Sequence, residues 1–226
     1  LFAAKKFNEA ELLFPQSEWA PKSALMAAYS YYSQDYYIDA IAETQRFIKI
    51  YPLHKNVDYA YYLLSLSYYE QIVDETKDLQ SISLAKKNFE TLINKFPNSS
   101  YVLDSKFKID LINDILAAKE MYVGRYYFEK KKWIPAINRF KVVVEDFETT
   151  IFVEEALHRL VEVYYTIGLK NEAKKYAQLL GYNYKSSDWY EKSYKLFNKS
   201  YEKNKIKIKK KKSLLSKLKS LADWDG

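Results

Sequence analysis

The chain has 226 residues, of which 48% are hydrophobic and 29% are charged, so it can bury a core and is not composed like a disordered protein. No stretch approaches the roughly 18 apolar residues of a membrane-spanning helix, and the lack of cysteine excludes disulfide frameworks and thiolate metal sites. Four glycines and five prolines favour long helices with few tight turns. The charge is uneven, because residues 191–226 carry a net +8 whereas residues 1–190 carry −1. The composition therefore predicts an all-α protein with a basic tail.

A repeat runs through the chain. An aromatic residue, usually followed by proline, recurs five times, and an alanine always lies eleven residues before it. The alanines are 37, 45, 51 and 37 residues apart. This pattern predicts helical hairpins, because a small alanine lets two helices approach and a proline stops the second helix. The alanine and aromatic pairs are Ala3 and Phe14, Ala40 and Tyr51, Ala85 and Phe96, Ala136 and Phe147, and Ala173 and Tyr184.

The predicted elements follow this repeat along the chain. Residues 1–14 are expected to be the second helix of a first, incomplete hairpin, and the next helices are expected to start at Ser17, Asn56 or Asp58, and Ser99 or Ser100. Residues 74–81 are polar without periodicity and indicate a loop. Residues 101–130 keep helical spacing without proline and predict one long helix. Apolar stripes mark two further helices, at Ala24, Ala27, Ala28 and Tyr31 and at Leu157, Leu160, Val161 and Tyr164.

The tail can form one helix from Trp189 to Ala222. Its apolar stripe follows the lysine-rich run 205–212, a combination that suits an anionic membrane surface or a groove on a partner. Nucleic acid would also attract these lysines, but the repeats are near neutral, so we do not expect it. A solvated tail is the plain alternative. The candidate contact residues are Lys209, Lys210, Lys211 and Lys212.

Several segments carry a family resemblance. The hairpin pattern is similar to the tetratricopeptide repeat, and "RFIKIYPLHKNVDYAYYLLSLSYYEQIVD", "KEMYVGRYY" and "AINRF" resemble the BamD family of outer-membrane assembly lipoproteins, in its alphaproteobacterial form. The resemblance covers residues 1 to about 195. It implies a right-handed superhelical stack of about five hairpins, the first incomplete, over residues 1–190, with joints near 15, 52, 97 and 148. The basic amphipathic tail over residues 191–226 is predicted from its own residues.

The resemblance also implies a function. Such proteins are non-enzymatic scaffolds, without cofactor or metal, in the barrel-assembly complex on the periplasmic face of the outer membrane. Their C-terminal repeats dock on BamA, beside other subunits, and their N-terminal repeats are proposed to receive unfolded outer-membrane proteins. The lipid anchor must be inferred, because the visible chain has neither a signal peptide nor a cysteine, and we expect it to be truncated. The alternative is a periplasmic repeat adaptor for envelope or cell-division processes.

Two groups of residues are candidate sites. The chain has more tyrosines than the repeat pattern needs, and their rings offer large amphipathic area at low entropic cost. We expect some of them to line a peptide groove, while the plain alternative for any one tyrosine is packing in the core or between repeats. Arginines of the fourth and fifth hairpins could bind partner carboxylates, or could form internal ion pairs with Glu120, Glu129, Glu155 or Glu162. His54 and His158 do not have metal-ligand spacing. The groove candidates are Tyr29, Tyr32, Tyr36, Tyr62 and Tyr69, and the BamA-side candidates are Arg125, Arg139 and Arg159, with Arg139 the first choice.

Overall fold

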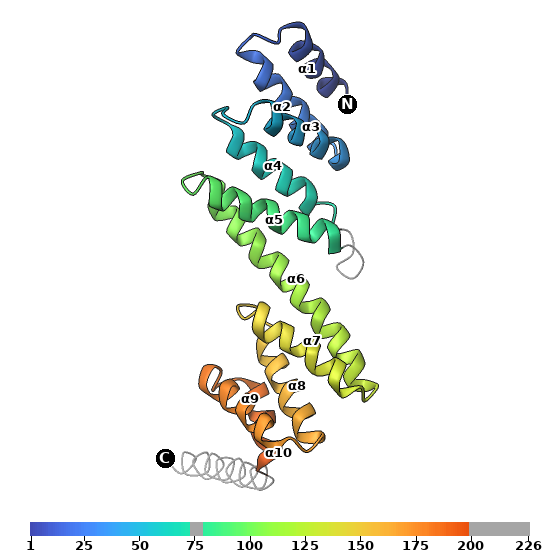
Figure 1. Cartoon of the computed structure of the whole chain (residues 1–226), viewed down its shortest axis with the longest axis vertical. Helices are drawn as coiled ribbons and strands as arrows, with labels where there is room; N and C mark the ends of the chain where they lie inside the picture. The colour runs from blue at the N-terminus through green and yellow to red at the C-terminus, as the bar shows by residue number, and fades with distance from the viewer. Residues whose placement is uncertain (73–78, 199–226) are drawn as a thin grey trace, which may run out of the picture. The chain divides into compact units, whose positions relative to one another are not determined.

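The structure is a computed structural model that describes residues 1–72 and 79–198. Within these residues it contains ten α-helices and no strand (Figure 1), as the composition predicts. None of the described helices is both long and apolar enough to cross a membrane. The helices are α1 (Phe2–Leu13), α2 (Trp19–Tyr32), α3 (Tyr37–Ile50), α4 (Val57–Tyr69), α5 (Leu79–Lys95), α6 (Val102–Glu129), α7 (Trp133–Asp146), α8 (Val153–Thr166), α9 (Lys170–Asn183) and α10 (Asp188–Phe197).

The chain forms two compact units, residues 1–119 (unit 1) and residues 120–226 (unit 2). In unit 1 the five helices α1 to α5 pack in succession, α1 on α2, α2 on α3, α3 on α4 and α4 on α5. In unit 2 α7 packs on α8, and α8 packs on α9. This succession of neighbouring helices is the arrangement of a tetratricopeptide-like stack. The predicted division into 1–190 and 191–226 differs from these units, and residue 191 falls inside α10, which packs on α8 and α9.

The repeat pattern explains how the hairpins close. All five aromatic residues stand directly after the last residue of a helix, α1, α3, α5, α7 or α9. Ala40, Ala85, Ala136 and Ala173 are fully buried, and so is the residue seven positions after each, two helical turns along the same face: Phe47, Leu92, Val143 and Leu180. Ala3 is the exception, since it is exposed and Ala4 is buried instead.

The turn inside three hairpins has one geometry. The amide of Tyr36 donates to the carbonyl of Tyr31, and Lys132 and Leu169 bond in the same way to Tyr127 and Tyr164. Such a bond, spanning six residues, needs a left-handed residue near the helix end. Asp35, Lys131 and Gly168 occupy that position, with φ of 62°, 57° and 87°. Tyr31, Tyr127 and Tyr164, each nine residues before the repeat alanine, therefore mark the end of the first helix in these three hairpins.

Three predicted segments have clear outcomes. The long helix is confirmed, because α6 runs without a break from Val102 to Glu129. The loop over 74–81 is wrong in its last three residues, because α5 starts at Leu79, one turn before its buried Ile82. The helix beginning near Trp189 ends at Phe197, since Asn198 leaves the helical region (φ −126°, ψ 83°). The remainder of the predicted tail helix, including Lys209, Lys210, Lys211 and Lys212, lies outside the described residues.

Candidate functional site

Tyrosines from two helices and one joint come together in unit 1. They come from α2, from α4 and from the residue that precedes α6, and α2 and α4 touch each other as well as their shared neighbour α3. The Tyr62 ring stacks on Tyr101 at 4.7 Å, and Tyr59 lies 5.4 Å from the same ring. The Tyr62 hydroxyl donates to Asp104 Oδ2 at 2.6 Å. We call this set the tyrosine surface: Tyr29, Tyr32, Tyr59, Tyr62 and Tyr101.

Tyr29 and Tyr32 lie on α2, which packs on α4, and they interact electrostatically with Tyr59. Burial raises the pKa of Tyr59 to about 12, and the phenols of Tyr29, Tyr101 and Tyr32 add to the rise. Burial also raises the pKa of Tyr62, followed by its hydrogen bond to Asp104. These phenols therefore stay neutral at physiological pH. A surface of neutral, amphipathic rings can take up apolar and aromatic side chains while its hydroxyl groups bond to a peptide backbone.

The structure brings together only part of the predicted groove. Tyr29, Tyr32 and Tyr62 belong to the tyrosine surface, whereas Tyr36 caps the start of α3, beyond the far end of α2. Tyr69 packs edge-on against Phe89 at 6.5 Å, and Tyr62 lies 6.3 Å from the same ring, so Tyr69 is a neighbour of the tyrosine surface on the side that faces α5. Tyr59 and Tyr101 were not among the predicted groove residues. For Tyr59 the sequence held a signal, because it lies three residues before Tyr62 and so shares its helix face.

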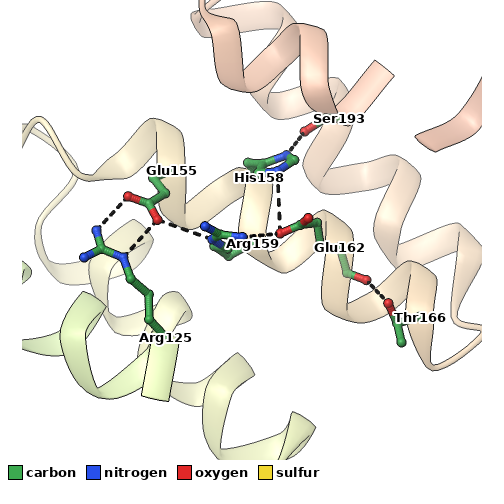
Figure 2. Close-up of polar contacts among 7 residues, drawn as sticks. All are labelled: Arg125, Glu155, His158, Arg159, Glu162, Thr166 and Ser193. Carbon is green, nitrogen blue, oxygen red and sulfur yellow. Dashed lines mark hydrogen bonds and ion pairs between the residues drawn. The ribbon is translucent and has the colours of Figure 1, made fainter. Parts of the chain in front are cut away.

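The predicted arginines of unit 2 include two that form a network with carboxylates (Figure 2). Arg125 on α6 holds Glu155 on α8 through two parallel bonds, Nε to Oε1 at 2.9 Å and Nη2 to Oε2 at 2.7 Å. Arg159 on α8 contacts Glu155 at 3.3 Å and Glu162 at 2.7 Å. Glu155 is therefore shared by two guanidinium groups, and Arg125 and Arg159 are connected through it.

The network continues to α10 through His158. Its Nδ1 lies 2.8 Å from Ser193 Oγ, and its Nε2 lies 3.5 Å from Glu162. The Arg159 guanidinium also stands over two rings, Phe128 at 5.4 Å and Trp189 at 5.7 Å. These contacts give α8 a fixed register against the end of α6 and against α10. The plain alternative considered for the arginines, an internal ion pair, thus describes what these side chains do within the chain.

The charges of the network settle the ionisation of its carboxylates. Burial by itself would raise the pKa of Glu155, but the bonds and charges of Arg125 and Arg159 outweigh it and hold the pKa below its ordinary value. Burial by itself would also raise the pKa of Glu162. The bonds and charges of His158 and Arg159 outweigh this effect, so the pKa of Glu162 is lowered as well. Both carboxylates are anionic at neutral pH, as ion pairing requires.

Arg139 is placed differently from the other two arginines. It lies on α7 and contacts Glu120 through Nη1 alone, at 2.9 and 3.2 Å, with its side chain 44% exposed. A small groove of about 270 Å³ lies beside it, lined in part by Tyr127, Ile134 and Pro135. The rest of its guanidinium fork points to no partner that the described chain supplies, so Arg139 can bind a second carboxylate while it keeps Glu120.

The described part of the chain holds no group of side chains that could bind a metal ion. Within residues 1–72 and 79–198, no three histidine, aspartate or glutamate side chains are grouped as metal ligands would be. His54 uses Nδ1 to accept the amide of Asn56 at 3.2 Å in the second joint, the capping role that its position favours. His158 is engaged by Ser193 and Glu162.

The fold defines a helical-repeat protein, and comparison with known proteins agrees. The family model described as outer membrane lipoprotein (YfiO) matches residues 1–179. Proteins named outer membrane protein assembly factor BamD are similar over most of the chain. The one from Rickettsia prowazekii is 46% identical, covering 86% of this chain and 77% of its own length. Those from Caulobacter vibrioides (42% identical; 87% and 64%) and Neisseria meningitidis (32%; 82% and 73%) follow. The chain belongs to the YfiO/BamD family.

Proposed function

We propose that this protein is a non-enzymatic scaffold of the outer-membrane β-barrel assembly machinery. Membership of a family whose relatives are named outer membrane protein assembly factors supports this function. It acts at the periplasmic face of the outer membrane, and the description of its family as an outer membrane lipoprotein supports an outer-membrane location. Its helical hairpins bind two partners, unfolded outer-membrane proteins through unit 1 and BamA through unit 2.

The observation that carries the substrate role is the convergence of neutral tyrosines in unit 1. An unfolded barrel protein presents extended strands with alternating apolar and aromatic side chains. Rings on a repeat scaffold supply large contact area with little side-chain entropy to lose, and their hydroxyl groups suit a backbone that is still unpaired. The tyrosine surface thereby recognises a class of segment instead of one sequence.

A pair of equally exposed tyrosines tests this role. Tyr29 belongs to the tyrosine surface and is 42% exposed, while Tyr36 lies outside it and is 43% exposed. A photo-crosslinking amino acid placed at residue 29 should capture an unfolded outer-membrane protein, and the same group at residue 36 should not. Equal capture at both positions would mean that exposure alone decides binding, and the tyrosine surface would lose its role.

The BamA contact is proposed at the exposed arginine of unit 2. Arg139 retains donors beyond its bond to Glu120, so a carboxylate on the partner can join it. Arg125 and Arg159 support the same face by fixing α6, α8 and α10 in register, with Arg125 the more exposed of the two.

This contact is tested by recovery of BamA from outer membranes with the full-length, lipidated protein. Arg139→Glu should lose BamA, whereas Glu120→Gln removes the same internal ion pair without reversing the surface charge and should keep it. If both variants lose BamA, the ion pair only supports the fold. If the unmodified protein recovers no barrel-assembly subunit, the adaptor function becomes the one to pursue.

A further inference from the structure

One edge of unit 1 exposes large apolar side chains at its hairpin joints. The joints at residues 14–18, 51–56 and 96–101 lie along the same edge (Figure 1), because each connects a second helix to the next first helix. Leu53 at the tip of the second joint is 97% exposed, and Trp19 at the start of α2 is 68% exposed. Leu103, in the first turn of α6, is 81% exposed. An exposed apolar side chain therefore lies at or directly beside each joint.

Lysines accompany these apolar residues at every joint. Lys22 Nζ stands 4.4 Å from the centre of the Trp19 ring. Lys55 is exposed two residues after Leu53, and Lys95 ends α5, its Nζ donating to the Tyr61 hydroxyl at 3.0 Å. Burial lowers the pKa of His54, and the charges of Lys55 and Lys22 lower it further. Each of the first two joints thus has a lysine close to an exposed apolar side chain, in space or in sequence.

A groove of about 540 Å³ joins the second and third joints. Its apolar walls include Leu53 and Phe96, and Lys55 and Lys95 both line it. Asp58 is the one carboxylate among the described residues that line it, and its oxygens already accept bonds from the Ser99 hydroxyl (2.7 Å) and the Tyr59 amide (2.8 Å). Two lysines therefore face one carboxylate among the described residues that line the groove, and the oxygens of that carboxylate are turned to neutral donors of the chain.

We propose that this joint edge of unit 1 rests on an anionic lipid membrane. Tryptophan and leucine side chains flanked by lysines suit the headgroup boundary, where rings and aliphatic tips enter the apolar layer and lysines meet phosphates. The apolar residues stand singly at successive joints with charges between them, which matches a flat bilayer better than the continuous apolar core of a protein interface. Phosphate groups flanked by acyl chains are the ligand chemistry that the groove offers. The family's description as a lipoprotein supplies the membrane, and the inference goes beyond the proposed scaffold function.

The absence of cysteine from the sequence allows a clean test. An environment-sensitive fluorophore is attached to Leu53→Cys in the full chain, and to Ile38→Cys as the matched control. Ile38 is 76% exposed but lies in the first turn of α3, beyond the opposite end of α2. Vesicles of phosphatidylethanolamine and phosphatidylglycerol should shift the emission of the probe at residue 53 to the blue and leave that at residue 38 unchanged.

Three further arms decide the source of the binding. Lys55→Gln with Lys95→Gln should weaken vesicle partitioning about 25-fold, because each lysine near an anionic surface contributes about fivefold. Inorganic phosphate alone should not shift the probe at residue 53, and a shift with phosphate would make the groove a free-anion site instead. Replacing Lys209, Lys210, Lys211 and Lys212 by glutamine should leave the shift at residue 53 in place. If vesicles pellet the protein without any change at residue 53, or with equal changes at 53 and 38, the proposal is overturned.

Discussion

Removing the Arg159 guanidinium should destabilise the α8 and α10 pair by about 2–3 kcal/mol. Hydrogen bonds to charged groups contribute about 1.5–3 kcal/mol and a ring contact about 0.5–1 kcal/mol. Arg159 bonds to Glu155 and Glu162 and stands over Phe128 and Trp189, with its side chain 25% exposed. These contacts would sum to about 4 kcal/mol or more if fully buried, and solvent screening of the partly exposed side chain lowers the expected loss to about 2–3 kcal/mol. Arg159→Gln also leaves two anionic carboxylates near each other without their shared cation.

The measurement is hydrogen exchange of the α8 and α10 amides, joined to urea unfolding. Exchange is needed because stability in a repeat stack is spread over neighbouring hairpins, so a local loss need not appear as one global transition. Arg159→Lys should recover less than half of the loss, since an ammonium cannot bridge two carboxylates as a planar fork does.

The control is a pair of similar length at an exposed site. Lys6 and Glu9 are 2.6 Å apart, with side chains 56% and 47% exposed, so Lys6→Gln should change stability by less than about 0.5 kcal/mol. The reasoning is refuted if Arg159→Gln and Lys6→Gln have equal effects.

Three other predictions concern packing, turns and pH. A methyl group at Gly124 would lie 2.6 Å from the Phe140 ring, so Gly124→Ala should destabilise unit 2 by about 1–3 kcal/mol in urea unfolding. Lys131 has a left-handed backbone, so Lys131→Gly should stabilise the protein by about 1 kcal/mol. Gly168→Ala, at φ 87°, should destabilise it by a similar amount. A destabilised Lys131→Gly or a stabilised Gly168→Ala would contradict the turn geometry. The pKa of Glu155 is lowered from its ordinary 4.5, so its contribution is complete above about pH 4.5 and is lost as the pH falls through the lowered value. Melting temperatures of wild type and Glu155→Gln should therefore converge in acid.

Much of the fold could be predicted because its signals are local. A proline or aromatic at a fixed distance after alanine reports one hairpin, and that hairpin is closed by contacts within about 40 residues. The helix ends inside three hairpins are local as well, since the carbonyls of Tyr31, Tyr127 and Tyr164 accept the bond from an amide five residues later. The exposure of Ala3 escaped prediction because it depends on which helix is present to cover it, and not on the residue itself.

The candidate sites were only partly predictable, because they join residues that are distant in sequence. Tyr62 and Tyr101 stack although 39 positions separate them, and Arg125 and Glu155 pair across 30 residues. The sequence showed that tyrosines and arginines were available in the expected hairpins. It did not show that Tyr101 would stack on Tyr62, or that Arg159 would be held inside unit 2 by two carboxylates and two rings.

By itself, the sequence determined the helical class, the hairpin joints and the family resemblance, because periodic apolar residues and turn-forming residues act over one or two helical turns. The tertiary structure decided which tyrosines converge, which arginines are occupied and which side chains remain at the joint edge. Those outcomes depend on how neighbouring helices are brought side by side, so that α2 meets α4, and α8 meets α10. The free energy of such contacts comes from burial and pairing between helices, and no short stretch of the chain contains both partners.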